Sequence, residues 1–311
     1  MKIAIILVNY NGKKYNEACI DSILQSQDTY DKYILFVDNA SADDSVAILE
    51  KKYGLNGQAK AIGDYTWLEI LKLDGNYGFA VANNRGIDRA KQLQTDYVLL
   101  LNNDTEIAPD MIQQLVACAD KHSGSMIIPK IYYSDDRKRI WSAGGSVSGI
   151  VSKVSHDGLD QIDNGQFEEE KETQFATGCC LLLPMSVIEK AGVLDERFFL
   201  YYEDTEYSFR LRKQGVTIYY CPKAYMYHKV GASSKGADSP LCAYYISRNW
   251  LLCNREHLGK RYSLFLLYYI VNRTSCCLLW ILQGKPQLAK AAIRGIGDYC
   301  HRKFGKTEYY G

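Results

Sequence analysis

Apolar runs alternate with amphipathic stretches over the first 130 residues of the chain. Five segments are predicted to be strands, and the first of them is a continuous apolar run, which is typical of a strand covered on both faces: Lys2–Val8, Tyr33–Val37, Leu68–Leu73, Tyr97–Leu101 and Met126–Pro129. Helical spacing or a helix-start signal follows the first four segments, and predicts helices at Asn16–Gln25, Val46–Lys52, Phe79–Lys91 and after Pro109. Strands that alternate with helices predict an α/β fold with a mostly parallel sheet.

The second half of the chain is less regular at first. Between Tyr132 and Thr173, Gly144-Gly145 and Gly149 indicate hairpins. Two helices and three further segments follow: Phe175–Pro184, Met185–Ala191 (helix), Asp204–Gln214 (helix), Thr217–Cys221 and Ala224–His228. Residues 239–304 are predicted to be helical. We interpret residues 1–258 as one α/β domain with halves 1–130 and 131–258, followed by a helical C-terminal extension over 259–311.

Composition narrows the function classes. The 311 residues include 37 Lys and Arg and 36 Asp and Glu, which gives a net charge of +1. This balance argues against nucleic-acid binding, which requires a basic surface. The N-terminal apolar run passes directly into Asn9 and Asn11, as in a buried strand rather than a signal peptide. The ten cysteines are therefore expected to be reduced thiols of a cytoplasmic protein, and the absence of a Cys-x-x-Cys pair disfavours a zinc site.

Polar residues follow four of the predicted strands at their carboxyl ends, where ligands bind in parallel sheets: Asn9 and Asn11, Asp38 and Asn39, Asn76, and Asn102 with Asp104. In the turn after the third strand, Gly78 allows the backbone to approach a ligand closely, and the helix start behind it favours an anion. An ordinary βα turn at Gly78 and a helix cap at Asp38 are the alternatives.

Three further positions carry candidate chemistry. Asp104 can hold a hard divalent cation together with diphosphate oxygens, or can be a turn residue. His228 can supply imidazole to the same cation, or can be structural. Glu203 and Asp204 follow four aromatic residues at a predicted helix start. A paired, partly dehydrated carboxylate has a raised pKa, as suits a general base, whereas the alternative is a helix cap.

Seven segments, taken together, resemble family 2 glycosyltransferases of the GT-A fold, in the rhamnosyltransferase-like branch that builds bacterial surface glycans. In chain order they are LVNYNG, VDNASADDS, NYGFAVANNRG, LLNNDT, FATGCCLL, LDERFFLYYEDTEYSFR and YHKVG. The resemblance covers residues 1 to about 249.

The resemblance implies roles by position. The residues implied to contact the donor nucleotide and its diphosphate are Val8, Asn9, Tyr10, Asn11, Asp38, Asn76, Gly78, Asn84 and Arg248. Asp104 and His228 stand where the family binds Mg²⁺ or Mn²⁺, and Asp204 stands at the catalytic base with Glu203 beside it. The family's Asp-x-Asp motif has Asn102 at its first position here, which predicts weaker metal binding that depends more on the diphosphate.

The expected function is that of a metal-dependent inverting glycosyltransferase. Residues 1–130 would bind the nucleotide-sugar donor, dTDP-rhamnose or a UDP-hexose, and residues 131–258 would bind a glycan, lipid-linked or glycoprotein acceptor. A catalytically silent sugar-nucleotide binder that assembles partners is the alternative. A nucleotidyltransferase is disfavoured, because it needs a Gly-rich basic loop and the segment LVNYNGKKYN has one Gly.

The segment Tyr262–Leu282 is apolar and long enough to span a bilayer. Polar residues at its middle, Asn272 to Ser275 with Arg273 among them, argue against a span. A packed helix or a subunit contact in a homo-oligomer is therefore favoured over peripheral membrane contact. Basic residues that follow would attract an anionic membrane at the inner face of the cell: Lys285, Lys290, Arg294, His301, Arg302, Lys303 and Lys306.

Overall fold

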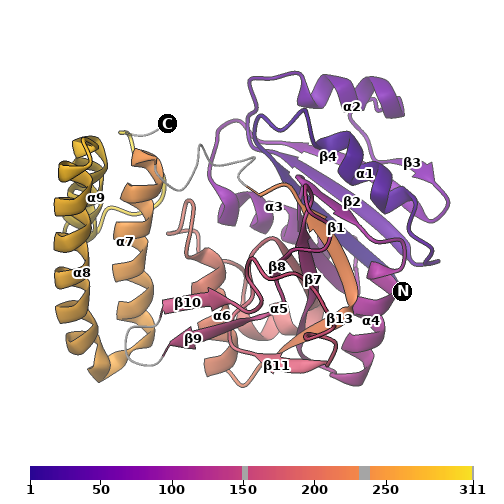
Figure 1. Cartoon of the computed structure of the whole chain (residues 1–311). Coiled ribbons are helices and arrows are strands. Elements are labelled where there is room, and N and C mark those ends of the chain that lie inside the picture. Colours follow the sequence, from indigo (N-terminus) through magenta and orange to yellow (C-terminus); the bar gives the residue numbers. More distant parts are fainter. Residues whose placement is uncertain (149–152, 231–238, 310–311) are drawn as a thin grey trace.

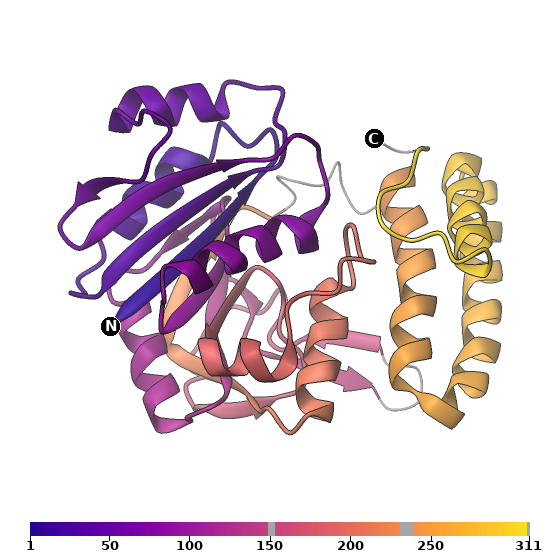
Figure 2. The same cartoon turned by 180° about the vertical axis from the view of Figure 1, so that it is seen from behind.

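The computed structural model describes residues 1–148, 153–230 and 239–309. Gly149, one of the predicted hairpin positions, and Gly231, the last residue of the YHKVG segment, lie outside the described residues. A sheet with helices on both faces makes up most of the molecule, and the C-terminal helices stand together beside it (Figures 1 and 2).

The described residues form one large sheet. The strands from the N-terminal half of the chain are mostly parallel to one another. Strand β1 lies between β2 and β5 and is parallel to both, and β4 is parallel to β2. The antiparallel strand β12 joins this half to β7, which pairs in parallel with β13. The order across the sheet is β11 (Lys171–Thr173), β13 (Ile218–His228), β7 (Met126–Tyr133), β12 (Cys180–Pro184), β5 (Tyr97–Asn102), β1 (Lys2–Asn9), β2 (Asp31–Asp38), β4 (Thr66–Lys72) and β3 (Lys60–Gly63).

Four further strands are short. β6 (Thr105–Ile107) pairs with the end of β13, and β8 (Ile140–Ser142) pairs with β7. β9 (Gly145–Ser148) and β10 (Lys153–His156) form a separate antiparallel pair, which agrees with the hairpin predicted at Gly144-Gly145.

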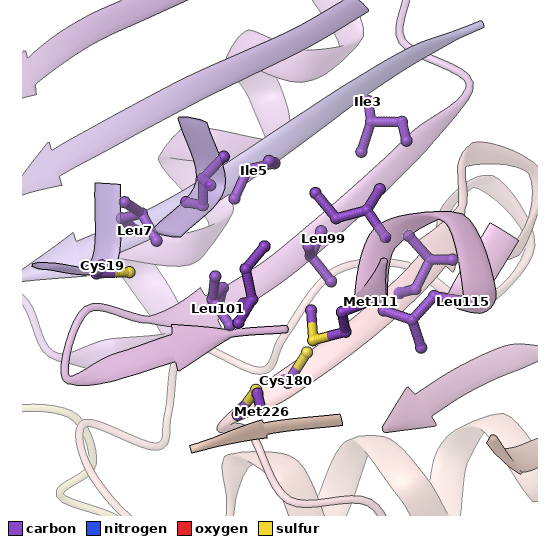
Figure 3. Close-up of a cluster of buried hydrophobic side chains, with 14 of the residues drawn as sticks. Ile3, Ile5, Leu7, Cys19, Leu99, Leu101, Met111, Leu115, Cys180 and Met226 are labelled. Carbon is purple, nitrogen blue, oxygen red and sulfur yellow. The ribbon is translucent and has the colours of Figure 1, made fainter. Parts of the chain in front are cut away.

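Two buried clusters lie on opposite faces of the sheet, because successive side chains of a strand point to opposite sides. Ile3, Ile5 and Leu7 of β1 join one cluster, part of which Figure 3 shows, and Ala4 and Ile6 join the other. The first face is covered by α1 (Asn16–Leu24), α2 (Ser45–Tyr53) and α4 (Met111–Lys121). The second is covered by α3 (Phe79–Gln92), α5 (Met185–Ala191) and α6 (Glu203–Lys213). The predicted α/β class is confirmed.

The structure corrects two local predictions and adds strands that were not predicted. The segments Thr217–Cys221 and Ala224–His228 are parts of one strand, β13, because a register shift between Cys221 and Tyr225 accommodates Pro222, which has no N–H to donate. Pro109 does not open α4, which is capped by Asp110 and begins at Met111. Strands β3 and β6 are too short for their pattern to show in the sequence.

The C-terminal helices form a bundle of α7 (Pro240–His257), α8 (Tyr262–Leu282) and α9 (Pro286–Cys300), with a short 3₁₀ turn at Gly259–Arg261. Ser239 is the N-cap of α7, and its hydroxyl accepts a hydrogen bond from Cys242 N at 3.2 Å. It is buried along most of its length and packs along α9. The predicted domain boundary after residue 258 falls between α7 and α8 and stays a prediction.

Helices α8 and α9 lie on the side of α7 that is away from the sheet (Figure 1), and α8 exposes many apolar side chains. It is long and apolar enough to cross a membrane, and only 11% of its most apolar stretch is buried. The exposed apolar side chains are Leu264, Leu266, Leu267, Tyr268, Ile270, Val271, Leu278, Leu279, Ile281 and Leu282. Arg273 turns inward, where its guanidinium lies 5.4 Å from the Trp250 ring centroid and 3.5 Å from Ser247 Oγ. The outer face of α8, defined by these exposed apolar side chains, therefore lacks the charge that the sequence places at the middle of this helix.

Candidate active site

A network of asparagines fixes the carboxyl ends of β1 and β2. Asn9, fully buried, donates through Nδ2 to Asp38 Oδ1 at 2.8 Å and to Ser41 Oγ at 2.9 Å. Its Oδ1 accepts from Asn16 and Asn103 side chains, both at 3.0 Å. Because every polar atom of the Asn9 amide is used inside the protein, Asn9 acts on this edge of the sheet as a positioning residue, and direct donor contact stays a prediction.

The turn after β4 is held to the same edge. Asn39 Nδ2 donates to Asn76 Oδ1 at 3.0 Å and to Gly78 O at 3.2 Å, and Asn39 Oδ1 accepts from Tyr77 N at 2.9 Å. Gly78 has φ +89°, and a Cβ there would lie 2.3 Å from Phe199 O. Glycine is thus required because the backbone before Glu203 packs directly on this turn.

Strand pairing brings the two predicted metal ligands together. Asp104 lies between β5 and β6, and His228 ends β13, where it pairs with Thr105 of β6. Lys229 N donates to Asp104 O at 3.0 Å. As a result, His228 Nε2 lies 3.3 Å from Asp104 Oδ1, and both side chains are more than nine-tenths buried. These two residues are distant in the sequence, and the fold places them side by side.

This pair fits a divalent cation. Adjacent ligands of an octahedral cation with bonds of 2.0–2.1 Å lie about 3 Å apart, close to the separation of the two ligand atoms. Carboxylate oxygen and imidazole nitrogen suit Mn²⁺ and, through the oxygen, Mg²⁺. The Nδ1 atom of His228 is buried and has no hydrogen-bond partner among the described residues.

Trp141, which the sequence pattern does not single out, packs edge-on against His228 and is the first of several packed rings. Trp141 of β8 lies with its ring centroid 4.7 Å from that of His228 and 4.7 Å from that of His156. His156 also packs edge-on against Phe175 at 5.5 Å, and its Nδ1 lies 3.0 Å from Ser142 Oγ. Burial lowers the pKa of His156 to about 4, so its ring is neutral at physiological pH.

Glu203 and Asp204 begin α6 after a strained loop. Tyr201 and Tyr202 both adopt positive φ, +66° and +73°, which costs free energy in residues other than glycine. Asn249 of α7 holds this loop, because its Nδ2 donates to Leu200 O at 2.9 Å and Tyr201 O at 2.8 Å. Strain of this kind, held by a buried side chain from another helix, is typical of functional sites.

The two carboxylates differ in their surroundings. Asp204 Oδ2 accepts from Gly178 N at 3.0 Å, and Oδ1 accepts from Thr205 N at 2.6 Å. Burial raises the pKa of Asp204, but these hydrogen bonds favour its charged form. Burial, and then the neighbouring Asp204 charge, raise the pKa of Glu203, whose buried Oε2 has no partner among the described residues. Asp204 is therefore the member of the pair that is stabilised as an anion.

One short backbone segment connects the two parts of the site. Gly178 N donates to Asp204, and the next residue, Cys179, accepts through its carbonyl from Asn102 N at 2.9 Å. Asn102 ends β5, two residues before Asp104. The carboxylate of α6 is thus linked through Gly178-Cys179 and two hydrogen bonds to the end of β5, from which Asn102-Asn103 lead to Asp104.

The structure places the other predicted site residues as follows. Val8 is half-buried, Tyr10 is 50% exposed, and Asn11 adopts φ +55° and accepts from Ala42 N at 2.8 Å. Asn84 is buried and is fully used by the loop 194–196, since it bonds to the backbone of Leu194 and to Glu196. Direct contacts of these residues with a donor stay predictions.

Arg248 does not lie at a strand end. It is buried in the helical bundle, where Nε donates to Asn249 Oδ1 at 3.0 Å and the guanidinium stacks near Tyr244 and Tyr245. Its neighbour Asn249 is connected more directly to Glu203 and Asp204, because it donates hydrogen bonds to the loop that precedes them. No roles for Asn249, Asn103 and Gly178 follow from the sequence alone. Their polar atoms form hydrogen bonds with residues that are remote in the chain, so the only signal for them is the motifs that contain them or lie beside them.

Solved structures share this architecture. The structure of GalNAc-T7 with UDP, GalNAc and Mn²⁺ matches with a TM-score of 0.64 at 14% identity, over 82% of this chain and 47% of that chain. The protein thus has the GT-A fold of glycosyltransferases.

Sequence comparison gives the family. The profile of glycosyl transferase family 2 matches residues 4–192, which is more than half of the chain, and the protein belongs to this family. The low-salt glycan biosynthesis hexosyltransferase Agl10 of Haloferax volcanii is 29% identical over 194 residues, 62% of each chain, so the match spans less than two thirds of that relative.

Two further relatives align over more of the chain. The dTDP-rhamnosyl transferase RfbF of Shigella flexneri is 23% identical over 82% of this chain and 81% of its own. The N-acetylglucosaminyl-diphospho-decaprenol L-rhamnosyltransferase of Mycobacterium tuberculosis is 23% identical over 72% of this chain and 75% of its own. The predicted resemblance to family 2 glycosyltransferases is confirmed.

Proposed function

We propose that the protein is a divalent-cation-dependent inverting glycosyltransferase that moves a sugar from a nucleotide diphosphate donor to a hydroxyl of a surface glycan. The proposal depends most on one observation, namely that Asp104 and His228 lie 3.3 Å apart at the strand ends and are linked through Gly178-Cys179 to the Asp204 carboxylate. Such a transfer needs two side chains that bind a cation and a carboxylate that acts as a base, and these lie at one edge of the sheet.

The base step follows from the surroundings of Asp204. In the proposed mechanism, Asp204 accepts the proton of the acceptor hydroxyl while that oxygen attacks the anomeric carbon and the bond to the diphosphate breaks. A single displacement of this kind inverts the anomeric configuration. The hydrogen bonds from Gly178 and Thr205 keep Asp204 charged and oriented before the acceptor arrives.

Asp104 and His228 would hold Mg²⁺ or Mn²⁺ at the donor. When bound, the cation offsets negative charge on the departing diphosphate. Asn102 stands at the first position of this motif without a charge, so donor affinity is expected to depend on the cation and the diphosphate together.

The donor class is proposed from the relatives. RfbF is a dTDP-rhamnosyl transferase by name, and Agl10 is a hexosyltransferase by name. We therefore propose dTDP-rhamnose as the first donor to examine and UDP-hexoses as the second. Family membership and the paired carboxylates favour this enzyme over a silent sugar-nucleotide binder.

A donor screen tests the proposal. Purified protein is incubated with dTDP-rhamnose, UDP-glucose, UDP-galactose or UDP-N-acetylglucosamine, with Mn²⁺ or with a chelator, and nucleotide release is measured. One donor is expected to be hydrolysed slowly in Mn²⁺ only, and the Asp104→Asn variant is expected to lose this release. Cation-independent release, or full release by Asp104→Asn, would contradict the metal assignment.

The outer face of α8 supports a location at a membrane surface. This face is apolar, Arg273 is turned inward, and Lys260 and Arg261 are exposed at its start. Apolar side chains beside basic ones are typical of helices that lie in a bilayer interface with anionic lipids. We propose peripheral contact of α8 with the inner face of the cell membrane, where lipid-linked acceptors would be present.

A further inference from the structure

A second cluster of metal-ligating side chains lies away from the proposed active site, where α4 and β11 meet β13 (Figure 1). Cys118 lies in the last turn of α4, and His122 is the C-cap residue of the same helix. Glu170 immediately precedes β11. The ligand atoms of these three residues all lie within 4.8 Å of one another.

A second thiol lies beside Cys118. Cys221 of β13 is, like Cys118, 1% exposed, and its Sγ donates to Gln114 O of α4 at 3.6 Å and is also hydrogen-bonded to the Cys118 thiol. Neither cysteine is in a disulfide. The hydrogen bond between the two thiols lowers the pKa of Cys221 and raises that of Cys118. Two thiolate ligands of a tetrahedral Zn²⁺ ion, each at 2.3 Å, lie about 3.8 Å apart, so adjacent thiols suit such a site.

The oxygen and nitrogen ligands are oriented by their neighbours. His122 Nε2 lies 3.3 Å from Glu170 Oε2, and the His122 ring stacks on Tyr219 with centroids 3.6 Å apart. Lys121 Nζ lies 2.9 Å from the other oxygen, Glu170 Oε1. This ion pair lowers the pKa of Glu170 and leaves Oε2 facing the cluster, as an outer partner of a metal-binding carboxylate does.

We propose that this cluster is a structural Zn²⁺ site with four protein ligands: Cys118, His122, Glu170 and Cys221. Two sulfur atoms, one imidazole and one carboxylate favour Zn²⁺ over Mg²⁺ or Mn²⁺, and four protein ligands leave no open position for substrate. The ion would fasten the end of α4 and the start of β11 to β13. The absence of a Cys-x-x-Cys pair does not exclude it, because the fold brings together thiols that are far apart in the sequence.

This site is independent of the proposed glycosyl transfer. Cys221 and His228 are seven residues apart on β13, which corresponds to about 20 Å along a strand. The Asp104–His228 pair offers carboxylate and imidazole, so a spectroscopic signal of thiolate ligation reports only on the cluster with cysteines. Failure of this proposal therefore leaves the proposed function unaffected, and the converse also holds.

The test is metal analysis of the full-length protein. Wild-type protein exposed to Zn²⁺ and desalted is expected to retain one zinc per chain in elemental analysis. After chelation, one equivalent of Co²⁺ is expected to give thiolate-to-cobalt charge transfer and the visible bands of a tetrahedral site, and Zn²⁺ is expected to abolish both. Loss of the ion is expected to lower the Tm.

Variants separate this site from adventitious binding. Cys221→Ser and His122→Ala are expected to lose the Co²⁺ bands, and Glu170→Gln to weaken them. His122 and Glu170 side chains are each 25% exposed, so their variants should fold even if a buried cysteine variant does not. The matched control is Cys300→Ser/His301→Ala, which removes an exposed thiol and imidazole on α9 and should keep the bands. No retained zinc in wild type, bands that persist in His122→Ala, or a Cys118–Cys221 disulfide in the purified protein would overturn the proposal.

Discussion

At the scale of single residues, the surroundings of a side chain decide its chemistry more than its type does. Asp104 and His228 lie side by side because β6 pairs with β13, while Asp204 is kept as an anion by backbone N–H groups. The sequence predicts all three from short motifs and a family resemblance. It does not predict Trp141 or Asn103, because their contacts are with residues that are remote in the chain.

The half-buried His156 beside this site predicts how stability depends on pH. The pKa of His156 is lowered by burial from 6.5 to about 4. Between these values the unfolded chain binds a proton that the folded chain does not, so stability falls as the pH drops from about 6.5 toward 4. At pH 5 the loss is on the order of 2 kcal/mol.

Denaturant unfolding at pH 7 and pH 5 measures this loss. The His156→Gln variant is expected to lose less stability than wild type over this interval, and His301→Ala, which changes an exposed ring, to lose as much as wild type. Equal losses in wild type and His156→Gln would show that His156 is charged in the folded protein at pH 5.

At the scale of elements, the main strands and helices follow from hydrophobic periodicity. The pattern predicts β1, β2, β5, α1, α3 and α5 to within a few residues, because each is covered by core on one or both faces. It does not predict β6, which has three residues and depends on pairing with β13. The pattern also does not predict the strained loop before Glu203, because the hydrogen bonds that stabilise its backbone come from Asn249 of α7.

Asn249 is therefore predicted to position the catalytic loop. Without its two hydrogen bonds to Leu200 and Tyr201 carbonyls, the positive-φ backbone before Glu203 should relax and move Asp204. Asn249→Ala is expected to lower kcat at least about tenfold with little change in donor Kd, because misplacing a catalytic group affects the chemical step.

The matched control is Asn254→Ala in the same helix, whose buried amide donates to Trp250 O at 2.9 Å. Asn254→Ala removes one buried hydrogen bond and should lose about 1–3 kcal/mol of stability, whereas Asn249→Ala removes three, including the one from Arg248 Nε, and should lose more. Only Asn249→Ala is expected to lose activity at a temperature where both are folded. Similar kcat values for the two variants would assign Asn249 to stability alone.

At the scale of the whole molecule, the α/β part and the helical bundle have different surfaces. The sequence predicts the length and apolarity of α8 but not the direction of its side chains. The middle of this helix is polar in sequence, yet Arg273 packs on Trp250 of α7 and leaves the outer face uncharged. This face is the strongest indication of a surface partner among the described residues.

Flotation with vesicles tests the membrane proposal. Wild-type protein is expected to float with vesicles that contain anionic lipid and much less with neutral ones. A Leu267→Glu/Leu278→Glu variant is expected to stay in solution, whereas Lys60→Glu, exposed on β3 at the opposite side of the molecule (Figure 1), should bind as wild type does. The contrary result is a wild-type protein that binds neither kind of vesicle and forms dimers in detergent-free buffer. If the α8 variant disrupts these dimers, the apolar face of α8 contacts a second copy of the chain instead of a membrane.

The roles of the two neighbouring carboxylates can be separated most directly by measuring donor binding and sugar transfer in Asp204→Asn and Glu203→Gln. Each variant removes one charge and nearly preserves shape. Asp204→Asn is expected to bind donor and Mn²⁺ as wild type does and to lose about 10²–10⁴-fold in kcat, which is the usual contribution of a general base. Glu203→Gln is expected to lose less than about tenfold, because burial already favours the neutral form of Glu203. Transfer by Asp204→Asn at the wild-type rate, or a larger loss in Glu203→Gln, would contradict the assignment of Asp204 as the base.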